Sequence, residues 1–285
     1  MGAWRIGSRT VHPIGIGTWG MGGDRLPDDE IYADYRSDDR ETEAIRAAVA
    51  LGQNHIDTAQ LYGAGHTEEI VGEAIAGLER EELFIATKVW RSHSLRHAVP
   101  RAAEESLRKL RIDAIDLLYV HAPWEAIPME EYIAGLDDAV DAGLARAIAV
   151  SNFSADQLLD AIRLSRHPIA ANQVRYSLLH HGQVDARMRQ VCAEHGVTIV
   201  AYRPVERRLL ADQTTSPVVL DAAAEVGCTP AQLAIAWVIN RPGVVAIPKA
   251  SSREHLEENI AAMRVQIPEG VRAKLDALGR GAGAE

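Results

Sequence analysis

Four side chains that could act in acid–base chemistry lie within or just after short apolar runs. Asp57 ends one such run, Lys88 lies inside the run Phe84–Val89, and His121 directly follows another. Tyr62 comes shortly after Asp57. A lysine inside an apolar strand needs a partner, because an unpaired buried charge is costly. Asp57 on the neighbouring strand is the expected partner.

Tyr62 is the candidate proton donor. A phenol with an ordinary pKa of about 10 donates poorly near neutrality, but a nearby ammonium lowers that pKa. Beside Lys88, Tyr62 would serve as a general acid. Each residue alone could be structural: an Asp57–Lys88 ion pair, a core tyrosine, and a histidine bonded to the backbone. Their occurrence together favours catalysis.

Eight short apolar runs would position these residues as strands. Each is too short for a helix, and amphipathic stretches rich in Ala and Leu separate them. We expect strands at Ile14–Thr18, Asn54–Asp57, Phe84–Val89, Asp116–Val120, Ala145–Val150, Ile169–Gln173, Thr198–Tyr202 and Val244–Ile247. Helices are expected near residues 40–52, 67–77, 97–110, 129–142, 154–165, 183–195, 230–240 and 252–263, with two additional helices near 217–226 and 268–278.

This alternation predicts an α/β fold, a (β/α)8 TIM barrel with two additional helices, in a single domain over residues 1–285. No linker rich in Gly, Ser and Pro divides the chain. In a parallel barrel the carboxyl ends of the strands meet at one mouth, so residues distant in sequence can form one site. An open doubly wound sheet is the competing architecture.

The segment Gly15–Gly20 supports that competitor, because it spells G-x-G-x-x-G after an apolar run. A Rossmann dehydrogenase would require a helix to begin there and hold a pyrophosphate on its amides. Instead, Met21–Pro27 contains two glycines and a proline. We therefore expect a glycine-rich loop and a barrel.

The composition limits the partners. The chain has 285 residues, 47% hydrophobic and 25% charged, and its net charge of -10 disfavours nucleic acid or an anionic membrane. Only Cys192 and Cys228 occur, so no disulfide framework and no metal site are indicated, and a cytoplasmic location is expected. No apolar run approaches membrane-spanning length, and the amino terminus lacks a signal core.

Several motifs, in the same order, resemble those of the aldo-keto reductase superfamily. They are His55–Gly63 (HIDTAQLYG), Thr87–Trp90 (TKVW), Asp116–His121 (DLLYVH), Val150–Phe153 (VSNF), Asn172–Gln173, Ala201–Tyr202 and Ile247–Lys249. The resemblance covers nearly the whole chain. It implies an NAD(P)H-dependent oxidoreductase of the alcohol dehydrogenase or carbonyl reductase type, which reduces aldehydes or ketones by hydride transfer from nicotinamide. It implies Tyr62 as proton donor, Lys88 and Asp57 as the pair that tunes it, and His121 as the group that orients the carbonyl.

The resemblance also implies where the cofactor binds. Ser151, Asn152 and Gln173 would hold the nicotinamide carboxamide, Tyr202 would stack on its ring, and the segment Lys249–Asn259 would bind the adenosine end. The full set of expected cofactor contacts is Gly17, Thr18, Trp19, Asp57, Ser151, Asn152, Gln173, Tyr202, Pro204, Val205, Lys249, Ala250, Ser251, His255, Glu258 and Asn259.

Two positions depart from the family pattern. Ala250 replaces the usual serine, and His255 stands where relatives have an arginine for the 2′-phosphate. An imidazole lacks the permanent charge and forked donors of a guanidinium, so the preference for NADPH should fall and NADH should also be used. Arg253, or backbone amides near Ser251, are the alternative phosphate ligands.

Three tryptophans are expected to form an apolar wall of the substrate pocket. They are Trp19, Trp90 and Trp124, beside Tyr62 and His121. The expected partner is a small-molecule carbonyl substrate, and the expected assembly is a monomer or weak homo-oligomer. The alternative function is a cofactor-binding regulatory barrel subunit with little turnover, and the complete catalytic set favours the enzyme.

Overall fold

The computed structural model describes residues 3–23, 31–206 and 216–278. Its central sheet has eight parallel strands in chain order, and an isolated parallel bridge between Ile14 and Ala246 joins the first strand segment to the last. The strands are β3 (Ile16–Gly17), β4 (His55–Asp57), β5 (Phe84–Val89), β6 (Leu117–Val120), β7 (Ile148–Ser151), β8 (Ile169–Arg175), β9 (Thr198–Tyr202) and β10 (Val244–Ile247). The predicted (β/α)8 TIM barrel is confirmed.

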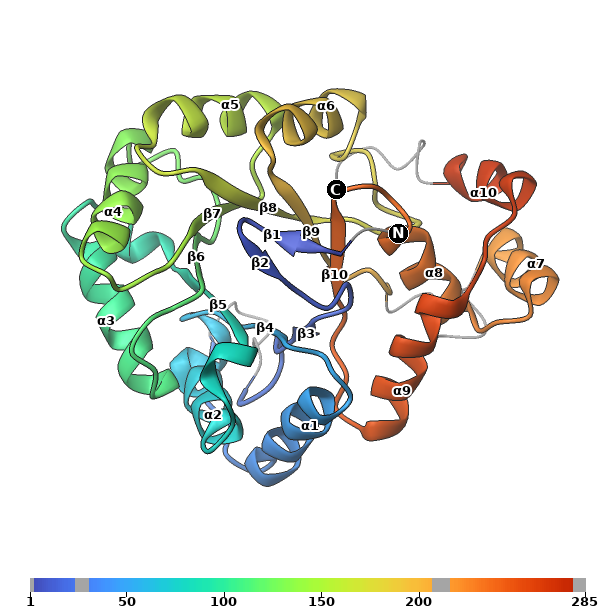
Figure 1. The fold of residues 1–285 in the computed structure, drawn as a ribbon, viewed down its shortest axis with the longest axis horizontal. Helices are drawn as coiled ribbons and strands as arrows, with labels where there is room; N and C mark the ends of the chain where they lie inside the picture. Colours follow the sequence, from blue (N-terminus) through green and yellow to red (C-terminus); the bar gives the residue numbers. More distant parts are fainter. Residues whose placement is uncertain (1–2, 24–30, 207–215, 279–285) are drawn as a thin grey trace.

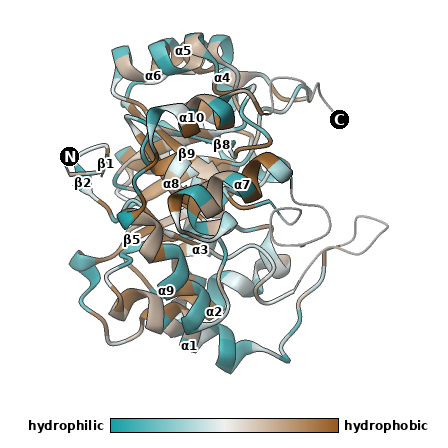
Figure 2. Cartoon of the chain, turned by 90° about the vertical axis from the view of Figure 1, so that its right-hand side faces the viewer, coloured by the Kyte–Doolittle hydropathy of each residue, from teal (hydrophilic) through white to brown (hydrophobic). Residues whose placement is uncertain are grey.

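Helices surround the strands in the view down the barrel (Figure 1). They are α1 (Asp38–Ala50), α2 (His66–Ile75), α3 (Ala98–Leu110), α4 (Met129–Asp141), α5 (Ala155–Leu164), α6 (Ala186–His195), α8 (Pro230–Ile239) and α9 (Arg253–Ala261), with α7 (Pro217–Val226) and α10 (Glu269–Asp276) as the two additional helices. Short 3-10 turns are η1 (Tyr62–Gly65), η2 (Arg80–Glu82), η3 (Arg91–His93) and η5 (Ala262–Arg264). Helices such as α2 and α9 carry both hydrophilic and hydrophobic residues (Figure 2), as expected when one face packs on a sheet.

A short hairpin closes the amino-terminal end of the barrel, and the sequence interpretation did not include it. Its antiparallel strands are β1 (Arg5–Ile6) and β2 (Arg9–Thr10). Ile6 is 1% exposed and belongs to the same apolar cluster as Phe84 and Leu117. In Figure 1 the hairpin lies within the ring of strands. Strands of two residues are too short to show a periodic pattern.

The glycine-rich segment serves strand packing. An added Cβ on Gly17 would lie 2.5 Å from the carbonyl oxygen of Ile247, and one on Gly15 would lie 2.8 Å from Nδ1 of His55. These glycines therefore let β3 approach β10 and β4 closely. No helix begins in this segment. The Rossmann and open-sheet alternatives are wrong.

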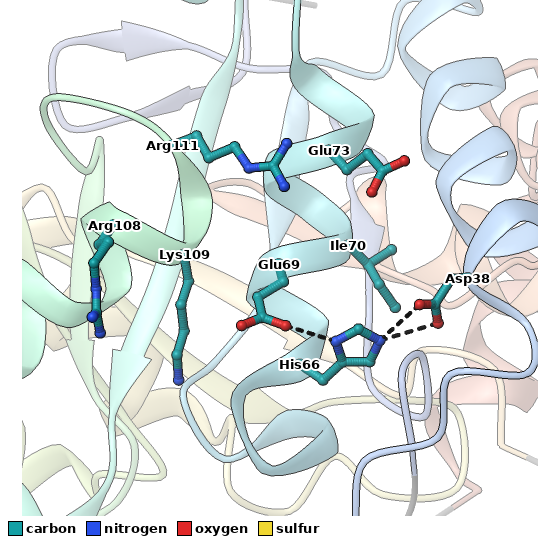
Figure 3. A pocket seen from close by; sticks show the side chains of 8 residues that line it. All are labelled: Asp38, His66, Glu69, Ile70, Glu73, Arg108, Lys109 and Arg111. Carbon is teal, nitrogen blue, oxygen red and sulfur yellow. Dashed lines mark hydrogen bonds and ion pairs between the residues drawn. The ribbon is translucent and has the colours of Figure 1, made fainter.

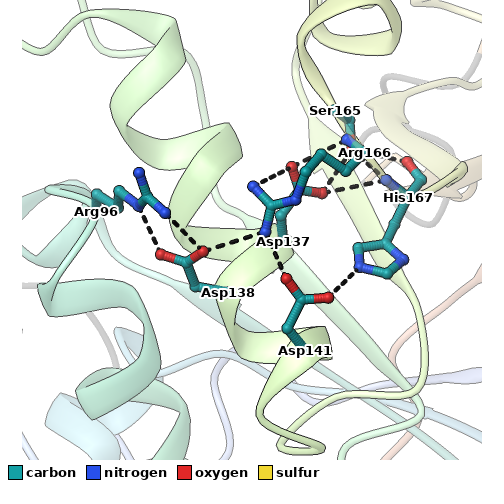
Figure 4. A network of polar contacts seen from close by, with 7 residues as sticks. All are labelled: Arg96, Asp137, Asp138, Asp141, Ser165, Arg166 and His167. Atoms are coloured by element: carbon teal, nitrogen blue, oxygen red, sulfur yellow. Dashed lines mark hydrogen bonds and ion pairs between the residues drawn. The ribbon is translucent and has the colours of Figure 1, made fainter.

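An ion-pair network on the outside fixes the entry to β8, as Figure 4 shows. Arg166 contacts three carboxylates of α4, and the shortest contact is 2.5 Å to Oδ2 of Asp141. Asp137 is fully buried and accepts hydrogen bonds from the backbone N–H groups of Arg166 and His167. Because β8 begins at Ile169, the network anchors the strand that carries Gln173.

Within the described ranges, no single helix is long and apolar enough to cross a membrane. The pair α7 and α8, bent by 84°, passes the same test by length and composition only. Most residues of α8 are buried within the protein. In this part of the chain, no group of three or more His, Cys, Asp or Glu side chains could hold a metal ion.

Candidate active site

Asp57, Lys88 and Tyr62 meet at the carboxyl ends of β4 and β5. Nζ of Lys88 lies 2.5 Å from Oδ1 of Asp57, 3.2 Å from the hydroxyl of Tyr62 and 2.9 Å from the carbonyl oxygen of Thr58. The other carboxylate oxygen of Asp57 accepts a hydrogen bond of 2.7 Å from Nε2 of Gln173. The expected pairing of Asp57 with Lys88 is present in the structure.

Burial and charge pairing act in opposite directions on the pKa values of these two side chains. Burial raises the pKa of Asp57, but the Lys88 ammonium and the Gln173 amide bond its two oxygens and favour the carboxylate. Burial also acts to lower the pKa of Lys88, but the charges and hydrogen bonds of Asp57 and Tyr62 together outweigh burial, and the lysine pKa is raised. The cluster therefore holds a fixed ammonium against the Tyr62 hydroxyl.

The expected low pKa of Tyr62 is not found. Burial raises the pKa of Tyr62, and the opposing effect of the Lys88 charge does not compensate. Tyr62 is 8% exposed, and this burial depends on tertiary packing that sequence spacing does not reveal. The phenol is therefore protonated at neutral pH, and its hydroxyl lies 3.2 Å from Nζ of Lys88.

A tight turn fixes Tyr62. The residue begins η1, in which Gly63 has a φ of 52°, a left-handed conformation that favours glycine. A Cβ on Gly63 would lie 2.3 Å from the carbonyl oxygen of Gly22, so η1 packs directly on the first loop. The Trp19 ring from that loop meets the Tyr62 ring edge-on, with centroids 4.9 Å apart.

His121 directly follows β6 and lies among the aromatic rings of the mouth. Its ring centroid is 5.8 Å from that of Tyr62 and 5.1 Å from that of Trp90. Burial, followed by the charges of Lys88 and Arg91, lowers the pKa of His121 to about 3. The imidazole is therefore neutral, and one of its ring nitrogens carries an N–H donor.

The residues expected at the nicotinamide end form one hydrogen-bonded group on β7, β8 and β9. Asn152 is its centre: its amide nitrogen donates to the carbonyl oxygen of His121 at 3.1 Å, and its amide oxygen accepts from the Tyr202 hydroxyl at 2.9 Å. Ser151 donates to the carbonyl oxygen of Gln173 at 3.0 Å. Asn152 has a φ of 62°, a left-handed conformation that is uncommon outside glycine and occurs often at functional sites.

The residues expected at the adenosine end lie after β10 and at the start of α9. Lys249 is exposed, and its Nζ would lie 3.9 Å from a Cβ on Gly20, which places it against the first loop. Ala250 is buried in the cluster under α1, which explains a small apolar residue there. Ser251 is half-buried, and His255 is exposed in the first turn of α9.

Other expected contacts have partners within the protein. Arg253, the alternative phosphate ligand, pairs with Glu257 at 2.8 Å. Glu258 accepts from the Thr229 hydroxyl at 2.8 Å, and Asn259 is buried. The hydroxyl of Thr18, beside Gly17, donates to the carbonyl oxygen of Asp57 at 3.0 Å. Pro204 and Val205 follow β9 at the same end of the barrel.

The residues expected at the nicotinamide end and those expected at the adenosine end are chemically suited to a dinucleotide. Amide and hydroxyl groups suited to a carboxamide meet at the ends of β7 and β8, near the Asp57–Lys88 pair. An exposed ammonium and the amino-terminal end of α9, where Ser252 caps the helix, are suited to a phosphate.

Sequence interpretation missed three residues that support the mouth. Thr58 supplies a carbonyl oxygen to Lys88. Gln60 binds the backbone N–H of Trp90 at 3.3 Å and the carbonyl oxygen of Ala102 at 3.1 Å, which fixes Trp90. Arg91 stacks on two of the expected pocket tryptophans. The position of Thr58 next to Asp57 could have indicated that it belongs to the site. A single arginine after a tryptophan gives no such indication for Arg91.

A separate hollow lies outside the barrel and does not include the candidate catalytic residues (Figure 3). Its volume is about 420 Å³, and α1, α2 and α3 contribute its lining. His66 lies between the carboxylates of Asp38 and Glu69, at 3.0 and 2.9 Å. Both ring nitrogens are therefore occupied, which indicates a structural role for His66 in joining the first turns of α1 and α2.

Comparison with known proteins gives consistent matches over the whole barrel. The Aldo/keto reductase family model matches residues 13–280. Methylglyoxal reductase YeaE of Escherichia coli is 33% identical over 276 residues, which cover 95% of this chain and 92% of that protein.

Solved structures match as well. The thermostable aldo-keto reductase Tm1743, in complex with the inhibitor epalrestat, has a TM-score of 0.89 and 38% identity, covering 98% of this chain and 99% of that chain. An aldo-keto reductase from Klebsiella pneumoniae in complex with NADPH has a TM-score of 0.84 and 35% identity, covering 96% and 93%.

Proposed function

The chain belongs to the aldo/keto reductase family, and from this membership we propose that it reduces aldehydes or ketones to alcohols with NADPH. The observation that carries the proposal is the contact of one buried ammonium, Lys88, with both Asp57 and the Tyr62 hydroxyl. A regulatory barrel would need the fold and the nucleotide site but not this arrangement. The relative solved with NADPH supports the choice of cofactor.

Tyr62 donates the proton in the proposed reaction. NADPH, when bound, would supply a hydride for the carbonyl carbon, which would leave negative charge on the carbonyl oxygen. The Tyr62 phenol gives its proton to that oxygen, and the resulting phenolate lies 3.2 Å from Nζ of Lys88. The ammonium, held by Asp57, thereby stabilises the product state of the transfer.

His121 orients the substrate carbonyl. Since its low pKa keeps the ring neutral, it can donate a hydrogen bond to the carbonyl oxygen without competing as an acid. Trp19 and Trp90, whose rings contact Tyr62 and His121, would exclude water from the reacting atoms.

The chain's own residues would hold the cofactor at two ends. Ser151, Asn152 and Gln173 bind the carboxamide, and Tyr202 packs on the ring. At the other end, Lys249 pairs with the 2′-phosphate, while His255 contributes no permanent charge. This difference supports use of NADH as a second cofactor.

The test is multiple-turnover consumption of NADPH with an aromatic aldehyde, in the native chain and in Tyr62→Phe. We expect the variant to lose at least about a hundredfold in kcat, because it lacks the donated proton. Its affinity for NADPH, measured by fluorescence quenching, should stay within about twofold. Tyr132→Phe is the matched control, since Tyr132 is a buried tyrosine on α4 outside the site. Turnover by Tyr62→Phe equal to that of the native chain would refute the assignment.

A further inference from the structure

Arg91 lies between two tryptophans beside the candidate site. Its guanidinium carbon is 4.6 Å from the centroid of the Trp90 ring and 4.3 Å from that of the Trp124 ring. Trp90 follows β5 and Trp124 follows β6, so both belong to the catalytic end of the barrel. Stacking on both rings holds the otherwise flexible cation in a defined place.

The stacked guanidinium keeps its hydrogen-bond donors available. The guanidinium carbon lies over both rings, and the N–H groups of a guanidinium project from its edge, in its own plane. In residues 3–23, 31–206 and 216–278, Arg91 forms no salt bridge and no side-chain hydrogen bond. Nearby Arg96, in contrast, binds Asp138 through two nitrogens at 2.6 and 3.0 Å. Arg91 is thus a positioned cation without a carboxylate partner in this part of the chain.

Ring contacts connect this cation to the reacting groups. The Trp90 ring lies 5.1 Å from the His121 ring, which lies 5.8 Å from the Tyr62 ring. The charge of Arg91 also contributes to the low pKa of His121, so its field reaches the site. A substrate whose carbonyl lies at Tyr62 and His121 could therefore extend along Trp90 and end at Arg91.

Building on the proposed reductase function, we infer that Arg91 selects carbonyl substrates that carry a carboxylate, such as oxo acids and aldehyde acids. A planar carboxylate matches the two parallel N–H donors on the edge of a guanidinium. The chain has a net charge of -10, so it offers an anionic substrate little general attraction. A local cation is then required to bind such a substrate.

The test compares two aldehydes of similar shape, 4-formylbenzoate and its neutral methyl ester, by kcat/KM with saturating NADPH. In the native chain we expect the ratio of the anionic to the neutral substrate to favour 4-formylbenzoate. In Arg91→Gln this ratio should fall at least tenfold, which corresponds to about 1.4 kcal/mol. Arg91→Lys keeps the charge but not the fork, and its ratio should lie between the two.

Arg108→Gln is the matched control for net charge. Arg108 is exposed near the end of α3, the end of the helix away from the mouth, and its substitution should leave the ratio within twofold. Added salt should lower the ratio in the native chain more than in Arg91→Gln, because salt screens an ionic contact.

The outcomes separate the two proposals. If the native chain reduces the methyl ester but Arg91→Gln leaves the ratio unchanged, Arg91 only packs on the tryptophans and this inference is wrong, while the reductase function stands. If the native chain reduces neither aldehyde, nor any of a wider panel of carbonyls, the proposed function fails and this inference fails with it.

Discussion

The amide nitrogen of Gln173 donates a hydrogen bond to Oδ2 of Asp57 at 2.7 Å, opposite the oxygen that Lys88 binds. A residue expected to hold the nicotinamide thus also supports the ion pair that we propose to act in catalysis. The contact crosses the inside of the barrel from β8 to β4, strands that are not adjacent in the sheet. It therefore links the residues proposed to hold the cofactor to the pair proposed to support the proton donor.

Gln173→Leu should destabilise the protein by about 1.5–3 kcal/mol, because it leaves one oxygen of a buried carboxylate without its donor. Gln53→Leu is the matched control: Gln53 is equally buried, but it donates to the neutral carbonyl oxygen of Ile14 at 3.0 Å. We expect the control to cost roughly half as much. Urea denaturation measures the loss in free energy of unfolding for both variants. Equal losses would show that the hydrogen bond to the Asp57 carboxylate stabilises the fold no more than one to a neutral carbonyl.

Lys88→Met should cost about 3–5 kcal/mol in the free energy of unfolding and abolish most activity, since it leaves Asp57 as an uncompensated buried charge. The double variant Asp57→Asn with Lys88→Met removes both charges, and it should regain much of the stability but not the activity. Chemical denaturation and aldehyde reduction would be measured on the same samples. A single variant as stable as the native chain would contradict an ionised pair.

His255→Arg should shift cofactor preference toward NADPH. The substitution adds a permanent cation with forked donors beside the start of α9, where we propose that the 2′-phosphate binds. We expect the ratio of kcat/KM for NADPH over NADH to rise about tenfold, or about 1.4 kcal/mol. His195→Arg, an exposed histidine at the end of α6, makes the same charge change elsewhere and should leave the ratio unchanged. An unchanged ratio in His255→Arg would indicate that other groups already hold the phosphate.

His66 should make stability depend on pH. Burial acts to lower its pKa, but the carboxylates of Glu69 and Asp38 outweigh burial and raise it overall. A raised pKa means that protonated His66 stabilises the fold at pH values below its ordinary value of about 6.5. This stabilisation is lost as the pH rises through the raised pKa. Its size should be about 1 kcal/mol, since both carboxylates are partly exposed.

The measurement for His66 is the melting temperature of the native chain and of His66→Gln. It is taken at pH values from below the ordinary histidine pKa of about 6.5 to well above it. The difference between the two should shrink as the pH rises. His195→Gln, at the exposed end of α6, controls for the removal of a histidine. A constant difference at all pH values would show that the charged form of His66 does not contribute.

Sequence patterns predicted most of the barrel, because each strand and helix has its own apolar period. The predicted starts near residues 154 and 230 agree with α5 and α8, whose N-cap residues Ser154 and Thr229 form capping boxes. The first strand was predicted too long: β3 covers only Ile16–Gly17, since the chain turns after the close approach of Gly17 to β10. The start of β7 was predicted too early, because Ala145 forms only an isolated bridge with Ile115.

The site was predicted less completely than the fold. The partnership of Asp57 and Lys88 follows from one rule, that a buried charge needs a counter-charge. The pKa of Tyr62 depends on the balance between that charge and burial, and burial is a property of the assembled barrel. The position of Arg91 depends on two tryptophans from different loops, which no local pattern connects.

The hairpin of β1 and β2 closes one end of the barrel and leaves the carboxyl end of the strands open. Ile6 and Val11 are buried there in the same apolar cluster as Phe84, Leu117 and Tyr119. We therefore predict that the proposed cofactor, the substrate and the product enter and leave at the carboxyl end of the barrel. The ligand that lies deeper must bind first and be released last. Closure of the amino-terminal end of the barrel therefore predicts an ordered sequence of binding and release.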